Sequence, residues 1–555
     1  MTTSRFFIFM FAFCFCRQVP AQEWRSELYA ADWNPEVKTF YVDKFLQDFS
    51  YAGYHRGEKN VPSGTGKVID VSKAPYHIQG NGQEDVTIPL QRVIDEAPRL
   101  DKPVVIYLPA GTYRLSPQKD KDYCLLIQRS EVVLRGAGAG KTFLFNSSTD
   151  MRGKDIVKIA ASSSWKTGGK NKQRITKDLV SPARVIPVAD ASGFRKGDRV
   201  IVRNYIDNSW IADHGMLEYW RDGGAALGGL MYCREVLSVD KQKNELVLDI
   251  PIRYSLLQQQ NSVVYIAPRM LTEVGIEDLS IGNRQSFGQG DWSEESYRQK
   301  ESPSYNLHDS WAVEMSQVYN GWIRNVRSYC PEGNSSGAHL LSNGIKLWQT
   351  ANVSLLQCDF SRPQYGGGGG NGYMYRIMGN ETLVSECAAH LSRHGFVLSG
   401  MNASGNVFFR CLDENTGTQT GLTGSEKTSG SGSDHHMHFS HSNLFDQCRV
   451  ENSFFAAGWR KWGGSVIHGL TAAHSAYWNI SSNGSQPFAV QSQQGRYGYV
   501  VGTSGDKPEV STDVWMKGTE SITDPVDFVE GIGKGRGLQP QSLYLDQKHR
   551  RLGKD

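Results

Sequence analysis

A cysteine recurs at one position of a repeated segment in the second half of the chain. Five segments open with Asn-Val, Thr-Leu or Asn-Leu and end at Cys330, Cys358, Cys387, Cys411 and Cys448. Successive cysteines are 28, 29, 24 and 37 residues apart, which suits one turn of a β-helix, with a loop in the longest turn. Such a repeat limits the fold strongly, because each unit buries its apolar side only against its neighbours.

A second apolar strand precedes each of these segments. The strands have period-two alternation, so one set of side chains enters a core and the other leaves it. The expected strands are Trp311–Glu314, Ile345–Trp348, Tyr373–Arg376, Phe396–Ser399, Met437–Ser440 and Ser465–His468. The inward column is Val313, Leu347, Tyr375, Leu398, Phe439 and Ile467, and the outward column is Glu314, Trp348, Arg376, Ser399, Ser440 and His468. An α/β fold is disfavoured because no helical pattern of about 10 to 15 residues lies between these strands.

The N-terminus has the pattern of a signal peptide. Arg5 precedes an apolar run from Phe6 to Cys16, and Val19-Pro20-Ala21 supplies the small residues of a cleavage site before Gln22. The apolar run is too short to cross a bilayer, and we expect no membrane span elsewhere. We therefore expect residues 1–21 to be removed and the mature protein to be secreted or periplasmic.

The charge balance limits the expected binding partners, and the cysteine count limits the expected disulfides. The chain has 60 Lys and Arg against 57 Asp and Glu, so nucleic acid is not an expected partner and attraction for a charged substrate must be local. Cys14 and Cys16 leave with the leader, and the odd number that remains argues for buried free thiols rather than a disulfide framework. We expect a monomer.

The segment before the repeats carries a family resemblance. Asp85 caps a helical pattern, the strand Val104–Leu108 runs into Pro109-Ala-Gly-Thr-Tyr113, and Leu134-Arg-Gly-Ala-Gly138 follows. This order resembles the opening of the pectate-lyase-like superfamily. The resemblance implies an all-β right-handed parallel β-helix with an N-terminal capping helix. Members of the superfamily are mostly polysaccharide lyases and glycoside hydrolases, with some tailspikes.

Four parts of the mature chain are expected. They are an N-terminal extension over 22–85, the parallel β-helix over 86–505, an inserted small β subdomain at about 184–254, and a C-terminal tail over 506–555. The insertion is predicted from short strand patterns around Gly193–Val200 and Glu245–Leu248. The tail has few apolar residues and is expected to cover the last coil loosely.

Polar residues gather at one place on three consecutive predicted coils. Arg393-His394, Asp434-His435-His436 and Arg460-Lys461-Trp462 each come just before a first strand. Lys346, Arg376, His438 and His468 should point outward beside them, with Tyr373 and Trp462 for stacking on sugars. On a rigid scaffold such a patch indicates a binding cleft.

The residue types favour β-elimination over hydrolysis. Hydrolysis needs two carboxyl groups about 5 to 9.5 Å apart, whereas this patch offers only Asp434, unless Asp413 or Glu314 lies near it. Elimination from a uronic acid needs a base, an acid and cations for the sugar carboxylate. We expect His394 or His438 as base, Arg393, Arg376 or Arg460 as carboxylate clamp, and His435 or His468 as acid or orienting group. Lys346, Lys461 and Asp434 complete the expected substrate-binding set.

The sequence therefore predicts a secreted lyase acting on an acidic polysaccharide. A glycoside hydrolase on the same scaffold and a non-catalytic glycan-binding protein are the alternatives. The polygalacturonase signature and the calcium-binding aspartates of the pectate lyases proper are absent, so no catalytic residue is carried over from either family. His435-His436-Met437-His438 resembles a metal-binding string, but it has no regular ligand spacing and we expect no metal site there. Calcium, used by many related lyases, stays open, although the patch offers few acidic oxygens.

Overall fold

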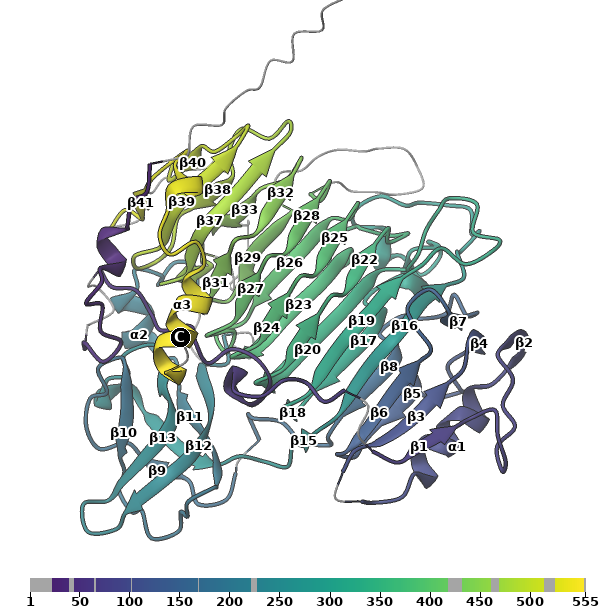
Figure 1. Cartoon of the computed structure of the whole chain (residues 1–555), viewed down its shortest axis with the longest axis horizontal. Coiled ribbons are helices and arrows are strands. Elements are labelled where there is room, and N and C mark those ends of the chain that lie inside the picture. Colours follow the sequence, from purple (N-terminus) through teal and green to yellow (C-terminus); the bar gives the residue numbers. More distant parts are fainter. Residues whose placement is uncertain are drawn as a thin grey trace, which may run out of the picture.

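The computed structural model describes residues 22–38, 44–63, 66–100, 102–167, 169–220, 227–417, 432–460, 469–513 and 525–553. Three parallel sheets wind around one apolar core, and a separate antiparallel sheet lies beside them (Figure 1). The predicted all-β right-handed parallel β-helix is confirmed. The expected signal peptide lies outside the described residues.

From β5 onwards, each coil places a strand in the first sheet and then continues through the second and third sheets. The first sheet contains β5 (Tyr123–Ile127), β8 (Asp155–Ala160), β17 (Trp311–Ser316), β20 (Asn343–Ala351), β23 (Tyr373–Asn380), β26 (His394–Ser399), β29 (Ser433–Met437), β33 (Phe455–Ala457), β38 (Val490–Ser492) and β40 (Val510–Ser511), with the short β15 (Leu271–Thr272), β18 (Val318–Tyr319), β30 (Ser440–His441) and β36 (Ala472–Ala473) at its margin.

The second sheet contains β1 (Val68–Asp70), β3 (Val104–Leu108), β6 (Val132–Gly136), β16 (Gly275–Asn283), β19 (Trp322–Ser328), β21 (Ser354–Leu356), β24 (Leu383–Ser385), β27 (Val407–Phe409), β31 (Leu444–Asp446), β37 (Ala476–Asn483), β39 (Tyr499–Gly505) and β41 (Phe528–Glu530). The third contains β2 (Asn81–Asp85), β4 (Gly111–Leu115), β7 (Thr142–Asn146), β22 (Asp359–Ser361), β25 (Ala388–His390), β28 (Leu412–Glu414) and β32 (Arg449–Glu451). The long strands β16, β19 and β37 bend and pair in both.

Helices are few. α1 (Thr87–Glu96) buries Leu90, Val93 and Ile94 in the main core beside the first strands of the β-helix. The N-cap is Val86 and not the predicted Asp85, which ends β2 and accepts a hydrogen bond from the backbone N–H of Thr87, the first helical residue, at 2.9 Å. The other α-helices are α2 (Asn208–Asp213) and α3 (Leu543–Leu552), and short 3-10 turns lie at Glu27–Tyr29, Tyr54–Gly57, Gln258–Gln260, Ser296–Arg298, Tyr305–Leu307 and Gly535–Gly537.

Four of the repeated cysteines stack at the bend between the second and third sheets. Cys358, Cys387, Cys411 and Cys448 are free thiols, buried in the main core. The residue before each has a φ between 52° and 54°, in the left-handed region, which turns the chain through the bend in a single residue. The prediction of one buried free thiol per coil is confirmed at these four positions.

Cys330 does not belong to this stack, and its prediction was wrong. It is exposed, two residues beyond the end of β19. Arg327 pairs with Asp359, the residue after Cys358, so Val326 occupies the cysteine position in that coil. The mismatch arises because β19 runs through the bend without a break.

The register of two later coils also differs from the prediction. Asp434 rather than His438 pairs with Val397 of β26. His438 and Phe439 both have positive φ and turn the chain away from the sheet, so Phe439 packs against the inserted sheet instead of entering the main core. In the next coil the strand is β33, so Arg460 follows the strand instead of preceding it, and the strand predicted at 465–468 lies outside the described residues.

The inserted sheet is antiparallel and wider than the expected 184–254. Its strands are β9 (Gln173–Arg174), β10 (Ala183–Pro187), β11 (Arg199–Asn204), β12 (Leu230–Asp240), β13 (Glu245–Ile252) and β14 (Ser262–Ile266). It leaves the β-helix after β8 but packs against later coils, close to α3 in Figure 1. A short hairpin of β34 (Trp459–Arg460) and β35 (Gly469–Leu470) contributes Trp459 and Leu470 to the same apolar cluster.

A buried ion-pair cluster attaches this sheet to the β-helix. Glu381, at the corner after β23, is 3.0 Å from Arg234 of β12 and 2.6 Å from Arg253, which follows β13. The three side chains are at most 1% exposed, so their charges are compensated by each other rather than by water.

The two ends of the chain pack together on the outer face of the second sheet. Tyr29 and Phe49 of the N-terminal extension form one apolar cluster with Leu543 and Tyr544 of α3 and with outward residues of β27, β31 and β37. Trp24 pairs with Leu538 in an isolated parallel β-bridge. Within the described part of the predicted tail, β40 and β41 pair with β38 and β39 and extend the β-helix, and α3 packs along its side, so the tail is not a loose cover over the last coil. Among the described residues, no helix is long and apolar enough to cross a membrane.

We predict that Glu381→Gln strongly destabilises the protein. The substitution leaves two buried guanidiniums against a neutral amide, and breaking such a cluster typically lowers the free energy of unfolding by about 3–5 kcal/mol. Urea denaturation measures the change. Glu386→Gln, at an exposed position in the following bend, is the matched control and should change stability by less than about 0.5 kcal/mol. Equal effects of the two substitutions would contradict the anchoring role.

A second prediction concerns Asp446, which holds the start of α3. Its carboxylate accepts hydrogen bonds from the Ser542 hydroxyl at 2.6 Å and from the Tyr544 N–H at 2.8 Å. Burial raises the pKa of this carboxyl from 3.8 to about 7. Between about pH 4 and about pH 7, the folded protein therefore holds a proton on Asp446 that the unfolded chain has lost. The contribution of Asp446 to the free energy of unfolding is full below about pH 4 and is lost as the pH rises through about 7.

Asp446→Asn keeps an acceptor oxygen but cannot ionise. We expect the variant to lose part of the decline in stability between about pH 5 and about pH 8, measured by urea denaturation at both values. Asp120→Asn, at an exposed turn, is the control and should keep the wild-type slope. An unchanged slope in Asp446→Asn would rule out this source of pH dependence.

Candidate functional site

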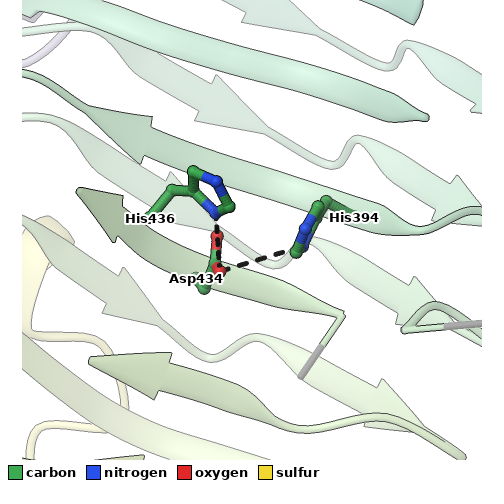
Figure 2. Close-up of side chains that lie close together, drawn as sticks. All are labelled: His394, Asp434 and His436. Carbon is green, nitrogen blue, oxygen red and sulfur yellow. Dashed lines mark hydrogen bonds and ion pairs between the residues drawn. The ribbon is translucent and has the colours of Figure 1, made fainter. Parts of the chain in front are cut away.

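Three side chains from two neighbouring strands meet on the outer face of the first sheet. His394 opens β26, while Asp434 and His436 occupy alternate positions of β29 and so point to the same side. The Oδ2 atom of Asp434 is 3.1 Å from Nδ1 of His436 and 3.8 Å from Nδ1 of His394. Figure 2 shows the carboxylate between the two imidazoles.

Tyr373, the first residue of β23, completes what we call the histidine cluster. Its hydroxyl is 2.9 Å from Nε2 of His436, so Tyr373, His436 and Asp434 form a hydrogen-bonded chain. Tyr373 and Asp434 are 1% exposed, whereas His394 and His436 retain 7% and 9%. Tyr373 was expected to stack on a sugar, but its buried ring serves instead to present a hydroxyl to His436.

Two arginines lie against the Tyr373 ring. The guanidinium carbons of Arg376 and Arg393 are 5.8 Å and 6.0 Å from the ring centroid. Arg393 donates to the carbonyl oxygen of Gly367 at 2.9 Å and is 3.8 Å from the Glu294 carboxylate. Arg376 donates to the Ser399 hydroxyl at 3.3 Å and forms no ion pair with any residue that the structure describes. It is the better placed of the two to bind an incoming carboxylate.

A pocket of about 410 Å³ opens on the same face and includes Arg376. Its walls come from four consecutive strands of the first sheet and the turns before them: Gly153, Asp155, Lys158, Asp309, Trp311, Glu314, Lys346, Trp348, Arg376 and Met378. Because the strands are stacked, the pocket runs across them towards β26 and β29. Val397 is the residue between Arg376 and Asp434 in the cross-strand row. We call the pocket of about 410 Å³ the carboxylate pocket.

Opposite charges alternate along the floor of the carboxylate pocket. Lys346 is 2.9 Å from Glu314, and Lys158 is 3.3 Å from Asp155. Burial, and then the nearby Glu314 carboxylate, raise the pKa of the Asp155 carboxyl well above its ordinary value. Two carboxyl groups, Asp155 and Glu314, thus lie on neighbouring strands, β8 and β17.

The structure brings together Arg393, His394, Asp434 and Tyr373 among the predicted site residues, with Arg376 and Lys346 beside them.

The prediction that His435 belongs to the site was wrong. His435 points into the interior, where Nδ1 is 2.7 Å from the Ser440 hydroxyl and its ring contacts Phe445 and Tyr477. Being on the opposite side of β29 from Asp434, it does not reach the cluster.

Five further predicted residues are not brought to the cluster by the described part of the chain. His438 is half-buried, beyond the end of β29, and its positive φ takes it off the strand. Arg460 is on β34, a different hairpin, and only its backbone is described. Lys461, Trp462 and His468 lie outside the described residues.

The carboxylate partners considered for Asp434 are also excluded by position. Asp413 is inside the β-helix, where it accepts hydrogen bonds from Ser433 and Thr416, and burial raises the pKa of its carboxyl to about 6. Glu314 is on the correct face but four strands from Asp434, or roughly 19 Å at 4.8 Å per strand. That separation exceeds the ~9.5 Å upper limit for paired hydrolytic carboxyl groups.

Sequence reasoning missed the far half of the carboxylate pocket. Asp155 and Lys158 belong to β8, which the inserted sheet separates from β17 in the chain, so the repeat alignment began too late to include them. The alternation of Asp155–Ala160 matches that of Trp311–Ser316 and is the signal that could have found them. His436 was placed in the same patch as His394 but was given no catalytic role, because its hydrogen bonds with Tyr373 and Asp434 depend on the strand pairing.

One group of three possible metal ligands is present among the described residues. The ligand atoms of His394, Asp434 and His436 all lie within 4.8 Å of one another. The donors are two imidazole nitrogens and one carboxylate oxygen.

Comparison with protein families gives one match. Residues 71–212 match the family described as rhamnogalacturonase A/epimerase, pectate lyase-like. The matched segment contains α1 and the strands named above for the resemblance, which it confirms. No curated protein matches the chain.

Solved structures give matches of low sequence identity. The tailspike gp61 of Pseudomonas phage phi297 is 13% identical with a TM-score of 0.45, over 81% of this chain and 71% of that one. The gp54 tailspike of Acinetobacter baumannii bacteriophage AP22, solved with a capsular saccharide, is 14% identical with a TM-score of 0.44, over 82% and 67%. The mannuronan C-5 epimerase AlgE4 A-module of Azotobacter vinelandii is 10% identical with a TM-score of 0.33, over 82% and 100%. By its own sheet topology the chain is a parallel β-helix protein, and its residues 71–212 are similar to the pectate-lyase-like rhamnogalacturonase A/epimerase family.

Proposed function

We propose that the protein is an exported polysaccharide lyase that cleaves a uronic-acid-containing glycan by β-elimination. The observation that carries the proposal is the hydrogen-bonded chain Tyr373–His436–Asp434 with the Arg376 guanidinium against the tyrosine ring. The chain supplies proton-transfer groups, and the arginine supplies a cation for the sugar carboxylate. Export rests on the leader pattern of residues 1–21.

The residues divide the reaction between them. Arg376 binds the uronate carboxylate, which makes the adjacent C5–H bond more acidic. His394 takes the C5 proton, the electron pair of the C–H bond forms the C4=C5 double bond, and the C4–O bond breaks. The Tyr373 hydroxyl protonates the leaving oxygen and is reprotonated through His436. Asp434 orients His436 by accepting its Nδ1–H.

The carboxylate pocket provides the remaining contacts with the polymer. Lys346 and Lys158 add positive charge, and Trp348 offers a half-buried ring for stacking on a sugar. Since the pocket crosses the strands towards the histidine cluster, a chain of sugars would lie across the first sheet with its cleaved bond near Tyr373.

A glycoside hydrolase is the second candidate, and one observation favours it. Asp155 and Glu314 are buried neighbours in the carboxylate pocket, and the raised pKa of the Asp155 carboxyl suits a general acid, with Glu314 as the second carboxyl group. In that case the cleaved bond would lie between β8 and β17 and the histidine cluster would only bind substrate.

Digestion of a panel of alginate, pectin and glycosaminoglycans by residues 22–555 tests the two chemistries. A lyase produces the ultraviolet absorbance of a conjugated C4=C5 double bond, and a hydrolase releases reducing ends without it. If new reducing ends appear but none of the polymers gives this absorbance, the lyase proposal is wrong and the hydrolase is favoured.

Substitutions then locate the reaction. Tyr373→Phe and His394→Ala should each lower kcat/KM by about 10²-fold or more, because each removes a proton-transfer group. Arg376→Gln should lower it by roughly 10 to 10²-fold, because it removes a charge-assisted contact with the carboxylate. His390→Ala, a histidine paired with Glu414 on the third sheet, is the control and should be unchanged. If Asp155→Asn and Glu314→Gln abolish cleavage while Tyr373→Phe does not, the active site is the carboxylate pocket.

A further inference from the structure

The histidine cluster has the geometry of a metal-binding site. Ligands bound to one zinc ion at about 2.0–2.2 Å in a tetrahedron are about 3.3–3.5 Å apart. The separations of Asp434 Oδ2 from the His436 and His394 Nδ1 atoms, 3.1 Å and 3.8 Å, lie on either side of that value. The ligand nitrogens of the two histidines lie within 4.8 Å of each other, so one ion at the position between the three side chains in Figure 2 would contact all of them after a small inward movement of the imidazoles.

The surroundings already orient one ligand. Nε2 of His436 is held by the Tyr373 hydroxyl at 2.9 Å, which leaves Nδ1 directed at Asp434. Metal-bound histidines characteristically use their second nitrogen in this way, because the outer hydrogen bond sets the ring orientation and the tautomer. Tyr373 is itself fixed by burial between β17 and β26, in a small cluster with Trp311 and Val397.

The donor set selects the kind of ion. Two imidazoles and one carboxylate suit zinc and the late first-row transition metals, whereas calcium and magnesium prefer a shell of oxygens. The Asp434 side chain is fully buried, and a divalent cation would compensate its charge where water cannot. Three protein ligands leave at least one coordination position for water or substrate.

We propose that His394, Asp434 and His436 bind a divalent transition-metal ion of the Zn²⁺ class, and that the bound ion inhibits the enzyme. The site itself follows from the three donors alone, while the inhibition rests on the proposed lyase function. Coordination occupies the lone pair on His394 that would accept the C5 proton, and it withdraws His436 from proton exchange with Tyr373. The same three residues therefore serve either proton transfer or metal binding, but not both at once.

Metal binding is tested on chelator-treated protein, independently of any substrate. Calorimetry with Zn²⁺ and visible absorption with Co²⁺ should give one ion per chain. His394→Gln and His436→Gln should each weaken binding by at least about 10²-fold, and Tyr373→Phe by about 10-fold, as expected for an outer-shell partner. His390→Ala should bind as the wild type does. Circular dichroism of each variant identifies loss of folding.

Two results would overturn the site: no heat or Co²⁺ spectrum with the wild-type protein, or equal affinity in the folded His394→Gln/His436→Gln double variant. Inhibition is tested separately by adding Zn²⁺ to the lyase assay, where activity should fall with the occupancy measured by calorimetry and return with a chelator. Activation by Zn²⁺ would overturn the inhibitory role. Metal binding without lyase activity on any polymer would support the site but reject the proposed function.

Discussion

The parallel register of the stacked coils is the constraint on which the rest of the structure depends. From β5 onwards, each coil places a strand on the first sheet, and hydrogen bonding sets neighbouring strands about 4.8 Å apart. Tyr373, His394 and Asp434 belong to three successive strands of that sheet, and only this stacking makes them contacts. The single-residue bends before the interior cysteines keep the coils in step, because each bend consumes one left-handed residue in the same place.

The inserted sheet and the two chain ends are built onto this stack by different forces. The insertion is held by buried charge, with Glu381 shared between Arg234 and Arg253, and by apolar contacts with Phe439. The ends are held mainly by apolar packing on the second sheet. Both attachments leave the outer face of the first sheet to the histidine cluster and the carboxylate pocket.

Two groups of ionisable side chains share the outer face of the first sheet, and they suit different kinds of chemistry. Around Tyr373 the ionisable groups are imidazoles and guanidiniums, which suit proton transfer next to a bound anion. Around Asp155 they are carboxyl groups paired with lysines, and burial raises the pKa of the Asp155 carboxyl well above its ordinary value. Arg376 lies at the boundary, lining the pocket while contacting the tyrosine ring.

The sequence by itself determined the fold class, because a repeated strand pattern with a buried cysteine can bury its apolar side only by stacking on itself. It also identified Arg393, His394 and Asp434 as neighbours, since their coils are consecutive. Only the tertiary structure decided which side of a strand each residue occupies. Two left-handed residues after β29 shifted the register, sending His435 inward and His438 off the strand, and a shift of this kind leaves no periodic signal in the sequence. The pairing of β8 with β17 across the insertion was decided there too, because hydrogen bonds between strands so distant in the chain depend on the completed stack.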